Sequence, residues 1–342
     1  MIRAGLIGFG LAGRYFHAPL ILAAGMELRA VVTSRDEAVR ETVPDAIVLA
    51  SADALFARAD IDLVVIATPN SLHAEQAADA LRAGKHVVVD KPLSITSAQA
   101  RVLAEFATAN RLRLAVFQNR RWDSDFLTVR KLIHEDRLGA INAYHARWDR
   151  FRPVVVDRWR ERAEPGAGVL YDLGSHLIDQ ALCLFGRPDW IQADVFAQRA
   201  GSAADDAFEI LMGRGTLRMT LGASTLVADG GWRYRIHGSR GSFLKAGLDP
   251  QEPQLRAGMR ADAPDFGFEP ADQWGKLILG ADGSRQTVAS ERGRWTAFYE
   301  GMRNSIERND PIPVPADAAR ATLEIIEAAF QSSAEKRRID LQ

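Results

Sequence analysis

The sequence predicts an α/β fold that begins with a doubly wound parallel sheet and continues into an α+β domain with a large open, mainly antiparallel sheet. Two observations predict it. In the first third of the chain, short apolar runs alternate with amphipathic helical patterns, whereas the later strand patterns follow one another without helices between them. A length of 342 residues suggests two domains. We place the boundary near residue 120, which gives domains of residues 1–120 and 121–342.

Five short apolar runs are the predicted parallel strands, because strands buried on both faces are continuously apolar. They cover residues 2–7, 28–33, 47–49, 63–67 and 86–89. Helical patterns between them include residues 11–24 and 72–83, and Gly84 stands where a helix C-terminus favours glycine.

Longer stretches with some apolar alternation are the predicted strands of the second sheet, and glycine-containing turns separate several of them. They cover residues 141–151, 190–199, 208–212, 216–224 and 232–237. Residues 250–270 are rich in Pro, Gly and Asp, which predicts an irregular connection. After residue 294, prolines within residues 311–315 split two helical patterns.

The composition excludes several classes of protein. The chain has 43 Lys and Arg against 44 Asp and Glu, so it has no general attraction to nucleic acid or to an acidic membrane surface. No membrane-spanning run and no signal peptide are recognised. Cys183 is the single cysteine, which predicts no intramolecular disulfide and no cysteine zinc site, and we expect no metal. We therefore expect a soluble, cytoplasmic protein with no nucleic-acid or membrane partner.

A GxGxxG motif follows the first predicted strand and opens the first predicted helix. It consists of Gly8, Phe9, Gly10, Leu11, Ala12 and Gly13. Gly8 permits a tight turn, Gly10 lets the backbone approach a pyrophosphate, and Gly13 lets the helix pack closely on the strand. A glycine-rich turn alone is a weak signal, but between a strand and a helix N-terminus it predicts a Rossmann domain that binds a dinucleotide.

The end of the second predicted strand indicates which dinucleotide binds. NAD sites usually place an acid there for the ribose 2′-hydroxyl, whereas an Arg accommodates a 2′-phosphate. Here Ser34 and Arg35 occupy the strand tip, which favours NADP, while Asp36 leaves NAD possible. The alternative makes Ser34 a helix N-cap and Arg35 a solvated surface charge.

Two further segments follow predicted strands at the carboxyl edge of the sheet, where such folds bind ligands. After the fourth strand come Thr68, Pro69, Asn70 and His73, although this segment could simply be a turn into a helix capped by Asn70 or Ser71. After the fifth strand comes Lys91, which Pro92 holds extended. A lysine there would lie near the nicotinamide, although most lysines are solvated surface groups.

A helical pattern over residues 170–185 has one apolar face and a polar stripe opposite. The stripe consists of Asp172, His176 and Asp179. Imidazole transfers protons near neutral pH and neighbouring carboxylates can orient it, which favours a catalytic role. A solvated polar face and a buried structural His–Asp pair are the alternatives. Gly174 within the helix indicates close approach by another element.

Taken together, these motifs resemble those of the Gfo/Idh/MocA family of oxidoreductases, whose members pair a Rossmann domain with an open-faced sheet domain. The resemblance extends almost end to end and is carried by residues 8–13, 67–73, 84–87, 90–92 and 172–176. Within the family, residues 33–35, 119–127, 158–160 and 171–176 resemble the NADP-dependent scyllo-inositol dehydrogenase branch. One departure is Asp90, because the family's usual residue there is Glu.

The resemblance implies that Lys91, Asp172 and His176 are the catalytic group. His176 would be the base that takes the hydroxyl proton, Lys91 would stabilise charge on the reacting oxygen, and Asp172 would bind a substrate hydroxyl. Arg121, Trp122 and Trp159 could line a substrate cleft or serve in packing.

We therefore predict an NADP-dependent dehydrogenase of a cyclic polyol or sugar, with NAD as a possible cofactor and residues 121–342 as the substrate-binding and oligomerisation domain. One alternative is an enzyme for another carbohydrate, such as an aldose oxidised at C1. A second is a non-catalytic regulatory module that binds a cofactor. The resemblance also implies a homodimer or homotetramer formed through the open sheet.

Overall fold

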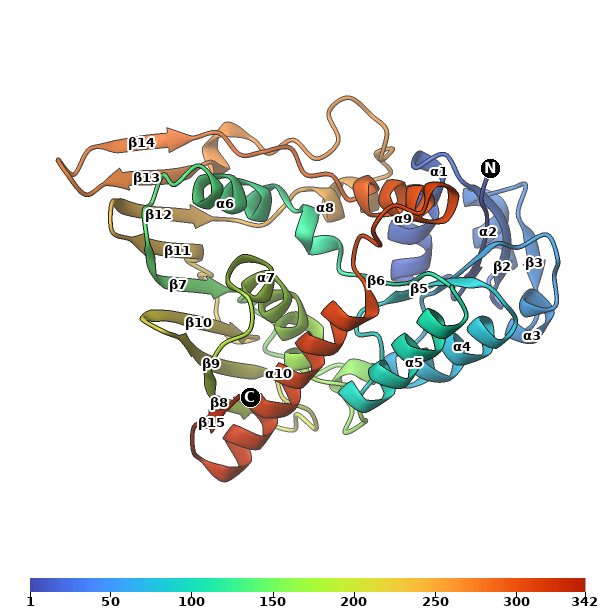
Figure 1. Cartoon of the computed structure of the whole chain (residues 1–342), viewed down its shortest axis with the longest axis horizontal. Coiled ribbons are helices and arrows are strands. Elements are labelled where there is room, and N and C mark those ends of the chain that lie inside the picture. Colours follow the sequence, from blue (N-terminus) through green and yellow to red (C-terminus); the bar gives the residue numbers. More distant parts are fainter. Residues whose placement is uncertain (342) are drawn as a thin grey trace. The chain divides into compact units, whose positions relative to one another are not determined.

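The structure is a computed structural model that describes residues 1–341, and these residues form two compact units (Figure 1). Unit 1 consists of Met1–Trp122, Gln251–Phe266 and Arg294–Arg320. Unit 2 consists of Asp123–Pro250, Gly267–Gly293 and Ala321–Gln342.

Unit 1 is built on a six-stranded parallel sheet with the strand order β3-β2-β1-β4-β5-β6. The strands are β1 (Arg3–Ile7), β2 (Glu27–Val32), β3 (Ile47–Leu49), β4 (Leu63–Ile66), β5 (His86–Asp90) and β6 (Leu114–Phe117). Every residue of β4 and β6 is buried, as expected for strands covered on both faces. The predicted doubly wound parallel sheet is confirmed, and β6 is a strand that the sequence analysis did not identify.

Helices cover both faces of this sheet (Figure 1). They are η1 (Gly13–His17), α1 (Ala18–Ala23), α2 (Asp36–Thr42), α3 (Ala52–Phe56), α4 (Asn70–Arg82), α5 (Ser97–Ala109), η2 (Asn119–Trp122), α8 (Gln251–Arg256) and α9 (Thr296–Arg308). Helix α4 packs against α3 and α5, whereas α1 packs against α9. Gly84 has φ +73°, so the glycine-terminated end predicted for α4 is confirmed.

Unit 2 is built on a nine-stranded sheet with the order β14-β13-β12-β11-β7-β10-β9-β8-β15. The strands are β7 (Ile141–Arg147), β8 (Trp190–Phe196), β9 (Ala207–Arg214), β10 (Leu217–Ser224), β11 (Trp232–Gly238), β12 (Gly241–Ala246), β13 (Gly275–Leu279), β14 (Arg285–Val288) and β15 (Ile339–Asp340). Strands β7 and β10 pair in parallel, and the other pairs are antiparallel. The predicted, mainly antiparallel sheet is confirmed.

One face of this sheet is packed and the other is exposed, as the alternation along β9 illustrates. Phe208, Ile210 and Met212 are buried, whereas Glu209 and Leu211 between them are exposed. The helical elements of unit 2 are α6 (Ser124–His134), η3 (Trp159–Glu161), η4 (Leu170–Gly174), α7 (Ser175–Phe185) and η5 (Ala271–Gln273), and α10 (Ala316–Glu335) lies mostly within it.

The two units are discontinuous in sequence, which a single boundary at residue 120 does not describe. Helices α8 and α9 belong to unit 1 because both segments contact its residues. Glu252 of α8 forms an ion pair with Arg120. Just before α9, the Arg294 N–H donates to the Trp122 carbonyl at 2.9 Å. Residues 250–270 are also more regular than predicted, since α8 occupies their first part. Pro253 fits within its first turn, where a missing N–H costs no helical hydrogen bond.

Within residues 1–341, no helix has the length and apolar character needed to cross a membrane.

Candidate active site

The glycine-rich loop between β1 and η1 leaves room for a ligand at one position only. A Cβ on Gly8 would lie 2.6 Å from the Ala67 carbonyl oxygen, and a Cβ on Gly13 would lie 2.1 Å from the Gly8 carbonyl oxygen. A Cβ on Gly10 would meet no atom within 4 Å. Gly8 and Gly13 are therefore required by close backbone packing, whereas Gly10 faces open space, so the loop fits a cofactor pyrophosphate.

The helix after this loop starts directly at the motif. The Arg14 N–H donates to the Gly10 carbonyl at 3.0 Å, so the N–H groups of the turn before it lie at a helix N-terminus. Phe9 is buried, whereas Leu11 is exposed. The next turn, η1, is π-helical and ends at His17.

Arg35 connects the end of β2 to the glycine-rich loop. Its Nη1 atom donates to the Phe9 carbonyl at 3.4 Å, and its backbone N–H donates to Thr33 Oγ1 at 3.1 Å. The N-cap of α2 is Arg35 and has no side-chain capping bond, so the alternative that made Ser34 the N-cap is wrong. Asp36 lies within α2 and pairs with Arg40 at 3.1 Å.

His73 holds two loops of unit 1 together. Its Nδ1 atom lies 2.7 Å from the Pro92 carbonyl oxygen, and its Nε2 atom lies 2.9 Å from the Thr68 carbonyl oxygen. Both ring nitrogens thus face main-chain oxygens, and the side chain is buried. His73 thereby joins the loop after β4 to the loop after β5.

The start of α4 differs from the capped turn considered as an alternative. The N-cap is Pro69, without a side-chain capping bond, and Asn70 is the buried first residue of the helix. The Thr68 hydroxyl donates to Gln76 Oε1 at 2.8 Å. The segment is therefore fixed by contacts other than an Asn70 or Ser71 cap.

Lys91 follows β5 directly, and its peptide bond to Pro92 is cis. The Lys91 N–H donates to Asp90 Oδ1 at 2.8 Å. Asp90 Oδ2 lies 3.9 Å from His17 Nε2. Burial opposes ionisation of Asp90, but His17, Lys91 and His73 outweigh it and lower the pKa of this carboxyl. Asp90 is therefore an anion at neutral pH beside Lys91.

In unit 2, Asp172 lies in the π-helical turn η4 between two arginines. Arg150 Nη1 is 3.5 Å from Asp172 Oδ2, and Arg160 Nε is 3.5 Å from Asp172 Oδ1. The Asp172 side chain is 24% exposed, so it is accessible to a small molecule. π-Helical turns within α-helices are frequent at functional sites.

His176 and Asp179 lie in α7, which continues from η4. His176 is buried and packs on Trp148 with ring centroids 5.8 Å apart, and Asp179 is buried as well. The alternative of a solvated polar face is therefore wrong for these two residues. A Cβ on Gly174 would lie 3.3 Å from the Phe208 ring, which confirms the close approach predicted at this glycine.

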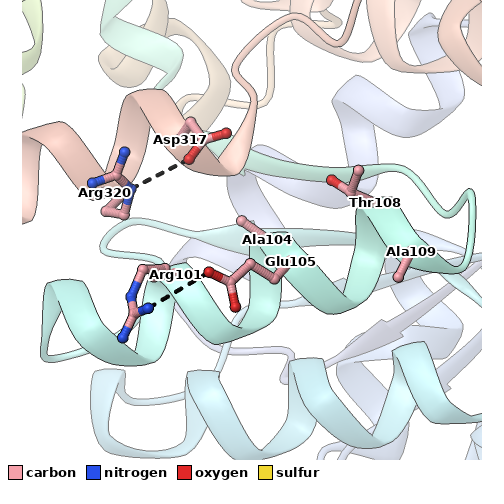
Figure 2. Close-up of a pocket in the computed structure, with 7 residues that line it drawn as sticks. All are labelled: Arg101, Ala104, Glu105, Thr108, Ala109, Asp317 and Arg320. Atoms are coloured by element: carbon pink, nitrogen blue, oxygen red, sulfur yellow. Dashed lines mark hydrogen bonds and ion pairs between the residues drawn. The ribbon is translucent and has the colours of Figure 1, made fainter.

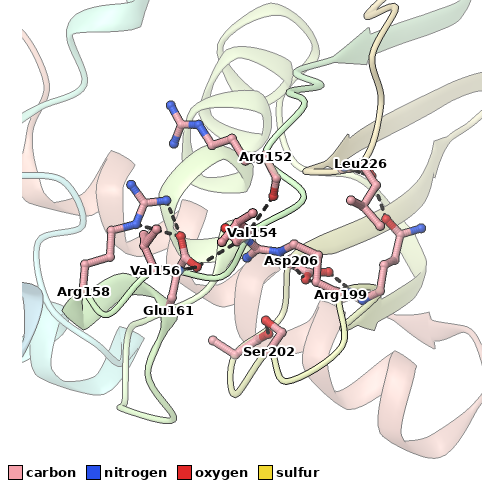
Figure 3. A network of polar contacts seen from close by, with 12 residues as sticks. Arg152, Val154, Val156, Arg158, Glu161, Arg199, Ser202, Asp206 and Leu226 are labelled. Carbon is pink, nitrogen blue, oxygen red and sulfur yellow. Dashed lines mark hydrogen bonds and ion pairs between the residues drawn. The ribbon is translucent and has the colours of Figure 1, made fainter.

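A buried ion network fixes the arginine-rich loop after β7 (Figure 3). Arg199 pairs with Asp206 at 2.8 Å and with Glu161 at 3.2 Å, and it also donates to the carbonyls of Arg152 and Val154. This loop carries Arg150 and Arg160. Sequence reasoning missed the network, although the density of arginines in residues 147–162 was a signal that could have been followed.

Two of the aromatic candidates have packing partners within their own units. The Trp122 ring meets Phe298 of α9 edge to face at 5.9 Å, and Arg160 stacks on the Trp159 ring at 4.4 Å. Arg121 lies beside Trp122 in η2 and is partly exposed.

A surface pocket of unit 1 lies elsewhere, between α5 and the start of α10 (Figure 2). Its charged side chains pair with one another: Arg101 with Glu105 at 3.6 Å, and Arg320 with Asp317 at 3.3 Å. None of the predicted site residues lines it.

Comparison with known proteins agrees with this geometry. Residues 2–118 match the model of the oxidoreductase family with an NAD-binding Rossmann fold (GFO_IDH_MocA), and residues 130–341 match the model of its C-terminal alpha/beta domain. The chain is 40% identical over 344 residues to scyllo-inositol 2-dehydrogenase (NADP(+)) IolW of Bacillus subtilis, covering 100% of this chain and 96% of that protein.

Two further relatives support the same grouping. The chain is 42% identical over 333 residues to the uncharacterized oxidoreductase YdgJ of Escherichia coli, covering 97% and 96% of the two chains. The solved structure of yvaA from Bacillus subtilis matches with a TM-score of 0.97 at 40% identity, covering 100% of this chain and 98% of that one. The chain therefore belongs to the Gfo/Idh/MocA family of oxidoreductases, enzymes that act on CH–OH groups with NAD(P).

Proposed function

We propose that the protein is an NADP-dependent dehydrogenase that oxidises a secondary alcohol of a cyclic polyol or sugar, with scyllo-inositol as the reference substrate. The observation that carries this proposal is the full-length similarity to scyllo-inositol 2-dehydrogenase (NADP(+)). The residue types at Lys91, Asp172 and His176 suit the same chemistry, because alcohol oxidation needs a proton acceptor and a cation beside the reacting oxygen.

In the proposed mechanism, His176 accepts the hydroxyl proton and returns it in the reverse reaction. Lys91 donates a hydrogen bond to the reacting oxygen and stabilises its developing negative charge. A bound nicotinamide would supply the hydride acceptor for this oxidation and, in its reduced form, the hydride donor for the reverse reaction. Positioned proton transfer of this kind contributes about 10²–10⁴-fold to the rate.

Asp172 binds and orients a substrate hydroxyl in this proposal. Its two arginine neighbours, Arg150 and Arg160, each lie 3.5 Å from a different carboxylate oxygen, so the side chain is restrained from both sides. A restrained carboxylate that is still 24% exposed suits hydroxyl binding, because an ionised carboxylate is a strong hydrogen-bond acceptor. We assign Asp179 and Trp148 to supporting His176.

The proposed cofactor site lies within unit 1. The glycine-rich loop would hold the pyrophosphate, and Thr68, Pro69 and Asn70 would line the site beside it. Ser34 and Arg35 would bind the 2′-phosphate, since Arg35 is a cation next to the Phe9 carbonyl and Asp36 is engaged with Arg40. His73 would position the two loops that it joins.

We further propose that residues 121–342 supply substrate binding and assembly. The exposed face of the nine-stranded sheet would form the contact of a homodimer or homotetramer, and the substrate cleft would include Arg121, Trp122 and Trp159. We place the protein in the cytoplasm.

The test is a panel of polyols and sugars, each incubated with NADP⁺ and with NAD⁺ while the absorbance of the reduced cofactor is followed. We expect reduction of NADP⁺ with an inositol. If only an aldose is turned over, the substrate is that carbohydrate and not an inositol. If the cofactor binds but no substrate is turned over in either direction, the non-catalytic alternative holds instead.

A further inference from the structure

A buried histidine that the proposed mechanism does not use lies behind Lys91. His17 ends the π-helical turn η1, and both it and Tyr299 of α9 are 0% exposed. The His17 ring packs on Phe117 with centroids 4.4 Å apart. His17, Tyr299, Asp90 and Lys91 all belong to unit 1.

Tyr299 determines which nitrogen of His17 carries hydrogen. The Tyr299 oxygen is 2.6 Å from His17 Nδ1, and within residues 1–341 this is the one hydrogen bond that the hydroxyl makes. Burial raises the pKa of Tyr299 well above its usual value, so the hydroxyl keeps its proton. A buried O–H with one partner donates to it, so Nδ1 is the acceptor and the N–H lies on Nε2.

The Nε2–H group faces Asp90. Nε2 lies 3.9 Å from Asp90 Oδ2 and has no hydrogen-bond partner within the described chain. At this distance the two groups do not form a hydrogen bond, but the Nε2–H points toward the Asp90 carboxylate. The other oxygen of this carboxylate, Oδ1, accepts from the Lys91 N–H at 2.8 Å. A small rotation of the Asp90 side chain would close the gap.

We infer that His17 is a positioning residue that orients Lys91 through Asp90, with Tyr299 fixing its Nε2–H tautomer. The inference rests on the proposed role of Lys91 and deepens it. The charged or titratable groups that act on Asp90 are His17, Lys91 and His73, together with Tyr299, whose hydroxyl keeps its proton and so carries no charge. An oriented Asp90 anion favours the ammonium form of Lys91, because an opposite charge nearby stabilises a cation.

Three substitutions separate this role from simple packing. His17→Leu keeps the apolar volume and removes both nitrogens, whereas His17→Gln restores an N–H donor directed at Asp90. Tyr299→Phe removes only the hydroxyl that selects the tautomer. Cofactor affinity and the melting temperature of each variant report whether unit 1 still folds.

The first readout needs no substrate. The ¹³Cε signal of Lys91, assigned by its disappearance in Lys91→Met, is followed across pH in each full-length variant. We expect its titration midpoint to fall in His17→Leu and to return toward the wild-type value in His17→Gln. An unchanged midpoint in His17→Leu, with the variant folded, overturns the inference.

The tautomer is tested by ¹⁵N chemical shifts of histidine-labelled protein, assigned by the loss of the His17 signals in His17→Gln. We expect protonated Nε2 and bare Nδ1 in the wild type, and loss of this preference in Tyr299→Phe. A ring with hydrogen on Nδ1 contradicts the assignment. Both NMR results stand even if no polyol is turned over, so they are independent of the failure of the proposed function.

Where a substrate is found, kinetics give the second readout. We expect His17→Leu to lower kcat roughly 10²-fold with little change in the KM for NADP⁺, because displacement of a catalytic group by about 1 Å has effects of that order. His17→Gln should recover most of the loss. Equal losses in both variants, accompanied by a lower melting temperature, would instead indicate a packing role.

Discussion

At the scale of single residues, the proposed choice between the two cofactors depends on one guanidinium group. Arg35 reaches the carbonyl of Phe9 within the glycine-rich loop, and the nearest acid along the chain, Asp36, is paired with Arg40. No carboxylate at the tip of β2 would therefore repel a 2′-phosphate. For the choice between NADP and NAD, the cation of Arg35 and the pairing of Asp36 with Arg40 therefore matter more than the net charge of the chain.

Arg35→Ala is expected to weaken NADP binding roughly 10- to 100-fold and to leave NAD binding almost unchanged, since a hydrogen bond to a charged group contributes about 1.5–3 kcal/mol. Titration of protein fluorescence with both cofactors measures this. Arg82→Ala is the matched control, because Arg82 is an exposed arginine at the C-terminal end of α4 in the same unit and should affect neither cofactor. Equal losses for both cofactors in Arg35→Ala would contradict the 2′-phosphate assignment.

Lys91→Met is expected to abolish turnover while NADP binding is retained, because Met keeps the length of the side chain and removes the cation beside the reacting oxygen. Activity on the best substrate of the panel and cofactor titration measure the two effects. Lys276→Met, at an exposed lysine of β13, is the control and should stay active. An active Lys91→Met variant would remove Lys91 from the mechanism.

At the scale of elements, two π-helical turns carry residues of the proposed site. Turn η1 ends at His17, and η4 contains Asp172. A sequence pattern read at 100° per residue predicts an α-helix over both segments, because the apolar period does not reveal a local change from i→i−4 to i→i−5 hydrogen bonding. The sequence thus predicted the helices and their candidate residues, but neither the π-helical turns nor the burial of His176.

The start of η4 depends on Asp205. Its carboxylate accepts from the Leu170 N–H at 2.7 Å, and burial raises its pKa to about 6. The folded protein therefore holds this proton more tightly than the unfolded chain, so the contribution of Asp205 to stability falls as pH rises from about 4 to about 6 and is then constant.

Asp205→Asn keeps an oxygen acceptor and removes this titration. The stability of the wild type relative to this variant should fall by up to about 3 kcal/mol between pH 4 and pH 7, the free energy equivalent of a shift from 3.8 to about 6. Urea unfolding of both proteins at several pH values measures it. A difference in stability that does not change with pH would show that Asp205 titrates normally.

At the scale of the whole molecule, the sequence predicted two sheets of different type but not the return of later segments to unit 1. The patterns of the parallel strands are local, whereas the pairing of Arg120 with Glu252 joins residues far apart in sequence. Edge strands such as β14 and β15 were missed because they are short and partly polar. Long-range packing of this kind leaves no periodic signal.

The open face of the nine-stranded sheet is expected to mediate self-association. Leu211 of β9 is exposed, in a hollow that Glu209, Thr220 and residues of β8 also line. Leu211→Arg should shift the protein from a dimer or tetramer toward monomer, as measured by light scattering after size-exclusion chromatography. Val102→Arg on α5 is the control in unit 1 and should not change the mass. A monomeric wild type would contradict this expectation.

The aromatic residues at the start of α9, which pack on the core of unit 1, have a consequence for the order in which the chain folds. Trp295, Phe298 and Tyr299 are all fully buried, and Phe298 meets Phe117 of β6 edge to face at 5.1 Å. A ribosome releases residues 1–122 long before it makes α9, and the partners His17 and Tyr299 are 282 positions apart. During synthesis, the apolar side chains that α9 covers in the finished protein therefore stay exposed until α9 has been made. We expect folding of unit 1 to be completed late and slowly for this reason.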